Sequence, residues 1–269
     1  MEFIQYETQG RVAVLTLDRP EARNAQTPQL LRELDANYDR ATEDENIRVI
    51  VLKANGKHFS AGHDISPEAT KNWKTEVDVG KSGLAGLYEW ERKNYLGMTR
   101  KWRDLPKPTI AAVQGGCIAA GLMLCWPCDL IVAADDAWFT DPVARMGIGG
   151  VEYHGHTWEF GARKAKELLF TGNRIGAEEA ERLGMVNRVV PRAELVEQTL
   201  ALATQIAEMD PFALSQAKRA VNQTLDIQGF YTSLQSVFDM HSLGHGNALS
   251  VTKGELAILM DLEGMKKKV

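Results

Sequence analysis

The chain has 269 residues, 44% hydrophobic and 25% charged, which fits one large globular domain or one domain with a helical appendage. A formal net charge of -5, without a basic stripe and interleaved aromatic residues, argues against a nucleic-acid partner. No apolar run reaches membrane-spanning length and the N-terminal residues do not resemble a signal peptide, so we expect a cytoplasmic protein without a membrane partner.

The first part of the chain predicts strands and a helix. Apolar runs bounded by turn residues predict strands over residues 2–7, 11–17 and 49–52, the first two as a hairpin. Thr27 is a suitable N-cap and Pro28 suits a first helical position, so we expect a helix to begin there. Residues 66–101 show no clean period until about Leu84, which predicts a mobile segment followed by a helix.

Residues 109–142 have the most informative pattern. Apolar runs at the two ends and small residues between them predict a strand, a tight turn, a buried helix and a second strand. Ala119, Ala120 and Gly121 would open the helix, where little Cβ bulk keeps a ligand from the backbone and the first N–H groups lack an intrahelical partner. A carbonyl oxygen that gains negative charge could bind there. Alternatively, the small residues only allow close helix packing.

The rest of the chain is predominantly helical in pattern. Amphipathic periodicity predicts helices towards the C-terminus, with a break at Asp210 and Pro211. Strands interleaved with helices come first and helices alone follow, so the predicted fold class is α/β. We expect a layered core over residues 1–195 and a helical subdomain over residues 196–269.

Two short patterns suggest other functions only weakly. Cys125 and Cys128 form a CxxC pair, but redox chemistry needs the first cysteine exposed at a helix N-terminus, and Cys125 is expected to be buried near a helix end. A zinc site would need two more ligands at suitable spacing, and no second CxxC or Cys/His pair supplies them, so no metal site is predicted. Residues 147–150 lack the full GxGxxG spacing of a dinucleotide-binding loop.

Four ordered motifs carry a family resemblance. They are RPEARNA at residues 19–25, FSAGHDI at 59–65, KPTIAAVQG at 107–115 and CDLIVA at 128–133. They resemble the RPxxxNA, FxAGxDI, KPxIAAVNG and CDxxIA motifs of the crotonase family, the enoyl-CoA hydratases and isomerases. The resemblance extends to about residue 225, and four motifs in order are far more specific than any one of them.

The resemblance implies a crotonase-like spiral of ββα turns with a C-terminal helical subdomain used in trimer formation. It also implies an acyl-CoA substrate, a homotrimer or a dimer of trimers, and no bound cofactor, because coenzyme A enters as part of the substrate. The family holds the thioester oxygen with two backbone N–H groups, which here would be the amides of His63 and Ala120. Donors of this kind contribute about 3–4 kcal/mol each to an anionic transition state.

The same resemblance suggests which residues bind coenzyme A. Its adenine and pantetheine parts would follow one loop, mostly through backbone groups, at Asn24, Ala25, Ala61, Asp64 and Ile65. Candidates for its phosphates are Arg23, Lys53 and Lys57. For each of these three cations the alternative is an ordinary solvated side chain.

The chain departs from the family pattern at both usual catalytic glutamates. A typical hydratase has one glutamate six residues before the Asp of CDxxIA and another directly after the Pro of FGxPE, where they transfer protons. Here the corresponding residues are Met123 and Val143. Neither can carry a proton, so we do not expect the standard two-glutamate hydration.

Other side chains could replace the missing glutamates. Glu152 lies in a loop that borders the acyl pocket in crotonase relatives and could form an acid/base pair with His154, unless it is an exposed loop residue. Asp141 is a further candidate, although its place before Pro142 also suits a helix N-cap. The imidazole of His63, where the family more often has Ala, could reach towards the acyl group.

Two functions of different classes remain. The first is an acyl-CoA enzyme that stabilises an enolate or oxyanion, for hydration, isomerisation, thioester hydrolysis or decarboxylation. The second is a CoA-thioester-binding protein with little or no catalysis. They differ in whether a titratable side chain lies near the His63 and Ala120 amides.

Overall fold

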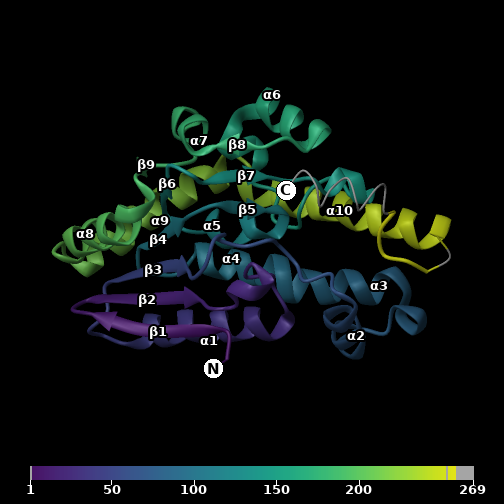
Figure 1. The fold of residues 1–269 in the computed structure, drawn as a ribbon, viewed down its shortest axis with the longest axis horizontal. Helices are drawn as coiled ribbons and strands as arrows, with labels where there is room; N and C mark the ends of the chain where they lie inside the picture. Colours follow the sequence, from purple (N-terminus) through teal and green to yellow (C-terminus); the bar gives the residue numbers. More distant parts are fainter. Residues whose placement is uncertain (1, 253, 259–269) are drawn as a thin grey trace.

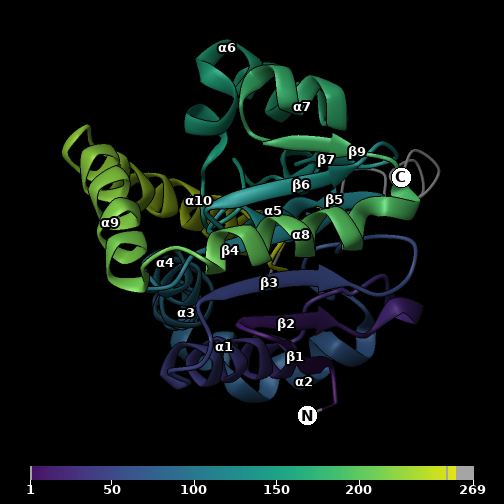
Figure 2. The same ribbon diagram turned by 90° about the vertical axis from the view of Figure 1, so that its left-hand side faces the viewer.

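The computed structural model describes residues 2–252 and 254–258, shown from two directions in Figures 1 and 2. A six-stranded sheet has the order β1-β2-β3-β4-β6-β9, with β1 and β2 antiparallel, as the predicted hairpin requires, and the later pairs parallel. Its strands are β1 (Ile4–Gln9), β2 (Val12–Leu17), β3 (Val49–Ala54), β4 (Thr109–Val113), β6 (Leu130–Ala134) and β9 (Arg188–Val190). A smaller sheet contains β5 (Gly116–Ile118), β7 (Trp138–Thr140) and β8 (Ile175–Gly176).

The central strands are buried on both faces of the sheet. On β3, Val49 and Val51 pack in a cluster with helix α8 (Leu195–Ala207), whereas Ile50 and Leu52 belong to the main core. Figure 2 shows α8 lying along the sheet, where it contacts β2, β3, β4 and β6. Because successive side chains point to opposite faces, a strand covered on both sides has a continuous apolar sequence.

Helices on the other face complete the main core. They include α1 (Pro28–Glu43), α4 (Gly97–Arg103) and α5 (Leu122–Cys125). Helix α1 begins as predicted, with Pro28 in its first turn and the Thr27 hydroxyl accepting a hydrogen bond from the Leu30 amide at 3.2 Å. Short 3-10 turns are η1 (Pro20–Ala22), η3 (Ala119–Gly121), η4 (Val143–Met146) and η5 (Arg192–Glu194).

Residues 66–101 are more helical than the sequence predicted. They contain α2 (Pro67–Glu76), α3 (Val79–Glu91), a π-helical turn η2 (Arg92–Leu96) and α4. Among the described side chains of α2, Ala69 alone is buried. The helix therefore shows little of the apolar periodicity on which a prediction depends.

The C-terminal helices return to earlier parts of the chain. They are α6 (His156–Thr171), α7 (Ala177–Leu183), α9 (Pro211–Ile227) and α10 (Phe230–Thr252), and the predicted pattern over residues 259–269 lies outside the described residues. Helix α10 contacts both α9 and α3, and Figure 1 shows α3 and α10 on the same side of the molecule. None of the described helices is long and apolar enough to cross a membrane.

Candidate active site

A cavity of about 560 Å³ lies among the loop after β3, the segment after β5 and helices α3 and α10. Six residues proposed from the sequence line it: Ala61, His63, Asp64, Ile65, Ala120 and Glu152. The lining also includes residues that the sequence did not suggest, among them Glu91, Tyr95, His241 and His245. The two loops with small residues thus meet at one cavity, together with side chains from distant helices.

The loop after β3 orients the amide of His63. The Gln26 amide donates a hydrogen bond to the Gly62 carbonyl at 2.8 Å, and the Asp64 amide donates to the Gln26 carbonyl at 2.9 Å. These two bonds form a parallel bridge between Gln26 and His63. Because such a bridge uses the groups that flank His63, the His63 N–H points away from Gln26.

The segment after β5 lies directly against this loop. A Cβ atom at Gly62 would lie 2.8 Å from the Ile118 carbonyl oxygen and 3.2 Å from the Ala120 nitrogen, and Gly62 has φ of +86°. Ala119 has a left-handed φ of 48°, an uncommon conformation for alanine. Ala120 follows as the second residue of η3, where an amide has no intrahelical acceptor. Within the described chain neither the His63 amide nor the Ala120 amide donates a hydrogen bond.

Glu152 and His63 form a hydrogen-bonded pair at the cavity. The Glu152 Oε1 and His63 Nε2 atoms lie 3.0 Å apart, and the His63 ring stacks on Tyr95 with centroids 4.0 Å apart. Tyr95 belongs to η2, so the π-helical turn presents the ring that supports His63. Glu152 is 2% exposed, which rules out the exposed-loop alternative.

His241 also contacts Glu152, at 3.6 Å between Nε2 and Oε1. Burial alone would raise the pKa of Glu152, but the nearby His63 and His241 lower it below its ordinary value. Burial would lower the pKa of His241, whereas the carboxylates of Glu152 and Glu91 raise it to about 9. The carboxylate of Glu152 is therefore held in its ionised form.

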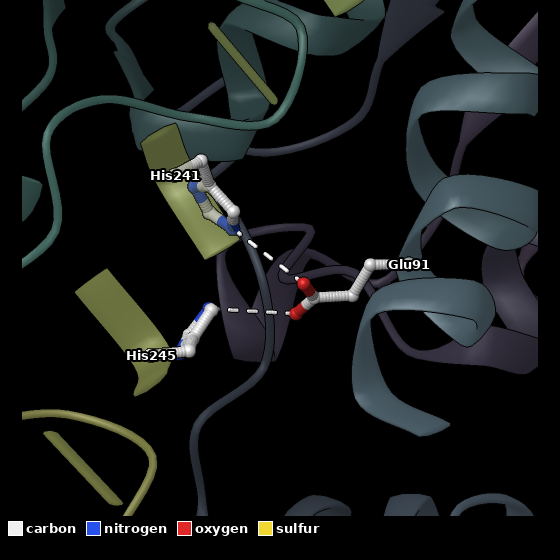
Figure 3. A group of neighbouring side chains, drawn as sticks. All are labelled: Glu91, His241 and His245. Atoms are coloured by element: carbon white, nitrogen blue, oxygen red, sulfur yellow. Dashed lines mark ion pairs between the residues drawn. The ribbon is translucent and has the colours of Figure 1, made fainter. Parts of the chain in front are cut away.

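A second cluster borders the same cavity. Glu91 ends α3, and His241 and His245 lie one turn apart on α10, with both rings directed at the Glu91 carboxylate (Figure 3). The Glu91 oxygens lie 3.7 Å from His241 Nε2 and 3.4 Å from His245 Nε2. In the sequence, the only local indication of this cluster is the four-residue spacing of the two histidines, which places them on one face of a helix.

Asp141 lies outside the lining of the cavity. Its side chain is fully buried and accepts hydrogen bonds from the amides of Val143 at 3.3 Å and Val151 at 3.0 Å. It also contacts His156 Nε2 at 2.9 Å. The N-cap alternative is wrong, because the N-cap of η4 is Pro142 and Asp141 lies one residue before it. These contacts fix the loop that carries Glu152.

The predicted pair of His154 and Glu152 is wrong. The imidazole that contacts Glu152 is that of His63. His154 lies outside the cavity lining, with its ring centroid 4.2 Å from that of His156. Burial first, and then the nearby His156, lower the pKa of His154 to about 3. His154 is therefore neutral at physiological pH.

The residues proposed for coenzyme A divide into two groups. Ala61, Asp64 and Ile65 line the cavity, and Ile65 is 59% exposed. Asn24 and Ala25 are buried behind it. The Asn24 side chain accepts from the Arg19 amide at 2.8 Å and donates to the carbonyls of Asn55 and His58 at 2.9 and 3.0 Å. Asn24 therefore holds adjacent loops together through its side chain.

Two of the three proposed phosphate-binding cations, Arg23 and Lys57, lie near His58. Arg23 and Lys57 are exposed, and Lys53 is partly buried. Burial first, and then the charges of Lys57, Arg23 and Arg192, lower the pKa of His58. Three cations thus act on one imidazole, which places their charges in one region.

At the usual glutamate positions, Met123 is buried outside the cavity lining and Val143 lines the cavity.

The cysteines do not form a reactive pair. Cys125 is fully buried, as predicted, and burial raises its pKa well above the ordinary value, as does contact with Cys117. Burial also raises the pKa of Cys128 to about 12. A redox CxxC motif requires the opposite shift.

Comparisons with known proteins found relatives in sequence and in structure. Residues 7–245 match the family model described as enoyl-CoA hydratase/isomerase. The chain is 45% identical to EchA13 of Mycobacterium tuberculosis, whose name assigns it provisionally as an enoyl-CoA hydratase, over 95% of this chain and 85% of that protein.

Two solved structures of probable enoyl-CoA hydratases are similar over nearly their whole length. The protein from Mycobacterium smegmatis is 61% identical, with a TM-score of 0.89, over 96% of this chain and all of that one. The protein from Mycobacterium thermoresistibile is 60% identical, with a TM-score of 0.87, over 93% of this chain and all of that one. The predicted α/β, crotonase-like fold class is thereby confirmed.

The Asn24 contacts lead to a prediction on stability. We expect Asn24→Ala to lower the free energy of unfolding by about 2–3 kcal/mol, because two partly buried carbonyls and one amide lose their partner. Urea unfolding measures this change. The control is Arg23→Lys, at the exposed neighbour, which should change stability by less than about 0.5 kcal/mol. Equal stabilities for the two variants would contradict the role given to Asn24.

The burial of His154 predicts a pH effect. Its folded pKa is about 3, whereas an unfolded histidine titrates near pH 6.5. Between these values the unfolded chain binds a proton that the folded chain does not, so stability falls as pH falls. We expect His154 to lower the free energy of unfolding by up to about 1.4 kcal/mol for each pH unit below pH 6.5. In urea unfolding at pH 7, 6 and 5, the free energy of unfolding of His154→Gln should fall less with pH than that of the wild type. Parallel curves of stability against pH for the two proteins would disprove the burial effect.

Proposed function

Because the chain belongs to the enoyl-CoA hydratase/isomerase family, we propose that its cavity binds the acyl part of a coenzyme A thioester and stabilises an enolate-like oxyanion. One observation carries this proposal: the amides of His63 and Ala120, from two loops in direct contact, have no acceptor among the described residues and lie at the same cavity. A pair of free N–H donors in a site of fixed geometry stabilises negative charge on a thioester oxygen.

The coenzyme A part would extend from this point along the loop after β3. Ala61, Asp64 and Ile65 supply backbone at the cavity, and the exposed Ile65 offers apolar surface to an adenine or pantetheine. Arg23 and Lys57 would bind phosphates at the region of positive charge around His58. No cofactor is required, because coenzyme A is part of the substrate.

Proton transfer is assigned to Glu152. Met123 and Val143 provide no carboxylate at the usual positions, whereas Glu152 is an ionised carboxylate at the cavity, hydrogen-bonded to His63. An ionised carboxylate can remove a proton from Cα while the two amides hold the oxygen that becomes negative. The proposed enzyme is therefore a lyase or isomerase of the family that does not use the standard pair of glutamates.

We also propose that the chain assembles as a homotrimer or a dimer of trimers, in which copies cover each other's apolar helices. Helix α9 has no buried residue, and its Phe212, Val221 and Ile227 are 72%, 62% and 88% exposed. Exposed apolar surface of this extent marks an interface. Light scattering after size-exclusion chromatography should give a multiple of three chains, and Val221→Glu should shift the mass downwards. A monomeric wild-type chain would contradict the proposal.

The catalytic proposal predicts a loss of proton exchange on removal of the Glu152 charge. In D₂O the wild type should exchange the Cα protons of a saturated acyl-CoA, a step common to hydration and isomerisation, as followed by mass spectrometry. We expect Glu152→Gln to slow exchange by about 10²–10⁴-fold while acyl-CoA affinity changes little, because general-base catalysis is lost and binding is kept.

Glu89→Gln is the matched control, since Glu89 has a side chain 62% exposed and lies outside the cavity lining. Its exchange rate should equal that of the wild type. Tight acyl-CoA binding by the wild type without exchange, and without turnover of any enoyl-CoA, would favour the alternative of a catalytically inactive thioester-binding protein. Unchanged exchange in Glu152→Gln would remove Glu152 from the mechanism.

A further inference from the structure

Glu91, His241 and His245 form a cluster beside the proposed acyl-CoA site, which they touch only where His241 contacts Glu152. All three side chains are buried, with exposed fractions of 4%, 5% and 8%, yet all three line the cavity. One nitrogen or oxygen from each lies within 4.8 Å of the others. Figure 3 shows the imidazoles of His241 and His245 on one helix, both directed at the carboxylate of Glu91 on a neighbouring helix. Two imidazoles and a carboxylate form a ligand set used by divalent transition metals.

Backbone contacts fix which ring nitrogen faces the carboxylate. His241 Nδ1 lies 2.7 Å from the Gly150 carbonyl oxygen, and His245 Nδ1 lies 2.6 Å from the Leu256 carbonyl oxygen. A carbonyl accepts only, so each Nδ1 carries a hydrogen and donates it. A metal ion that binds here takes the place of a proton on Nε2, whose lone pair is then directed towards Glu91. Carbonyl groups that accept from the other ring nitrogen orient metal-binding histidines in this way.

Two lone pairs directed at a carboxylate would repel it unless positive charge lies between them. Protons on Nε2 would draw the groups to hydrogen-bond distance, about 2.7–2.9 Å for charged partners. The observed separations are 3.7 and 3.4 Å, and neither His241 Nε2 nor Glu91 Oε2 has a hydrogen-bond partner among the described residues. Ligand atoms bonded at about 2.1 Å to a tetrahedral metal are about 3.4 Å apart. The two separations, which are to different oxygens of Glu91, are closer to this value than to hydrogen-bond distances, and the widest separation in the group, up to 4.8 Å, would shorten when an ion binds.

We propose that Glu91, His241 and His245 bind one divalent transition-metal ion, of the Zn²⁺ type, in the wall of the cavity. Three protein ligands leave a fourth position, and because all three residues line the cavity, that position is open to water or to a ligand oxygen. The imidazole nitrogens favour Zn²⁺ over Mg²⁺ or Ca²⁺, which prefer oxygen ligands. The site does not depend on the acyl-CoA assignment, because its ligands are not those of the proposed oxyanion and proton-transfer site.

Metal content and affinity test this proposal without any measurement of activity. Tag-free full-length protein is stripped with a chelator, loaded with Zn²⁺ and analysed by mass spectrometry for zinc and by titration against a chromophoric chelator. We expect one ion per chain, and Glu91→Gln and His245→Gln each to weaken binding by at least about 100-fold. His154→Gln, which removes a histidine outside the cluster, is the matched control and should bind as the wild type does.

A spectroscopic measurement on the wild type covers the case in which a cluster variant does not fold. X-ray absorption at the zinc edge should show two imidazoles, one or more oxygen ligands and no sulfur, which separates this site from one at Cys125 and Cys128. The proposal is overturned if the wild type binds no stoichiometric ion, if the spectrum shows sulfur or no imidazole, or if both cluster variants bind Zn²⁺ as tightly as the wild type. The first of these results would leave the acyl-CoA proposal untouched.

Discussion

The close contact between Gly62 and the start of η3 is the constraint on which the site depends. A side chain at Gly62 would collide with the Ile118 carbonyl, and its φ of +86° favours glycine. The contact brings two chain segments, one after β3 and one after β5, to the same wall of the cavity. Their strands belong to different sheets, and the bridge between Ser60 and Cys117 joins them. The free amides of His63 and Ala120 follow from this backbone geometry and do not need any particular side chain.

The side chains at the cavity are organised around buried charge. Glu152 is 2% exposed, and an isolated carboxylate at such a position would lose its charge. His63 on one side and His241 on the other keep it ionised. His63 is positioned in turn by the ring of Tyr95 in the π-helical turn. In the proposed mechanism this carboxylate, from another loop and with its own partners, takes the place of the missing glutamates.

The sequence predicted the parts of the molecule that local patterns determine. The β1–β2 hairpin, the Thr27 cap and the start of α9 after Asp210 rest on alternation or on capping, and each is present in the structure. The motifs predicted that the loops at His63 and Ala120 form one site, and both loops line the same cavity. The pairing of Glu152 was predicted wrongly, because nothing in the sequence says that His63, 89 residues away, lies closer than His154.

The Glu91 cluster shows most clearly where sequence reasoning ended. The spacing of His241 and His245 was readable, but the third member lies on α3, and only the packing of α10 against α3 brings it near. The same packing places His241 between Glu91 and Glu152, at 3.7 and 3.6 Å from their oxygens. Whatever positive charge the cluster holds therefore acts directly on Glu152 across a buried, weakly screened distance. Helix α10, which the sequence suggested only as part of a subdomain for assembly, thus supplies side chains to the cavity itself.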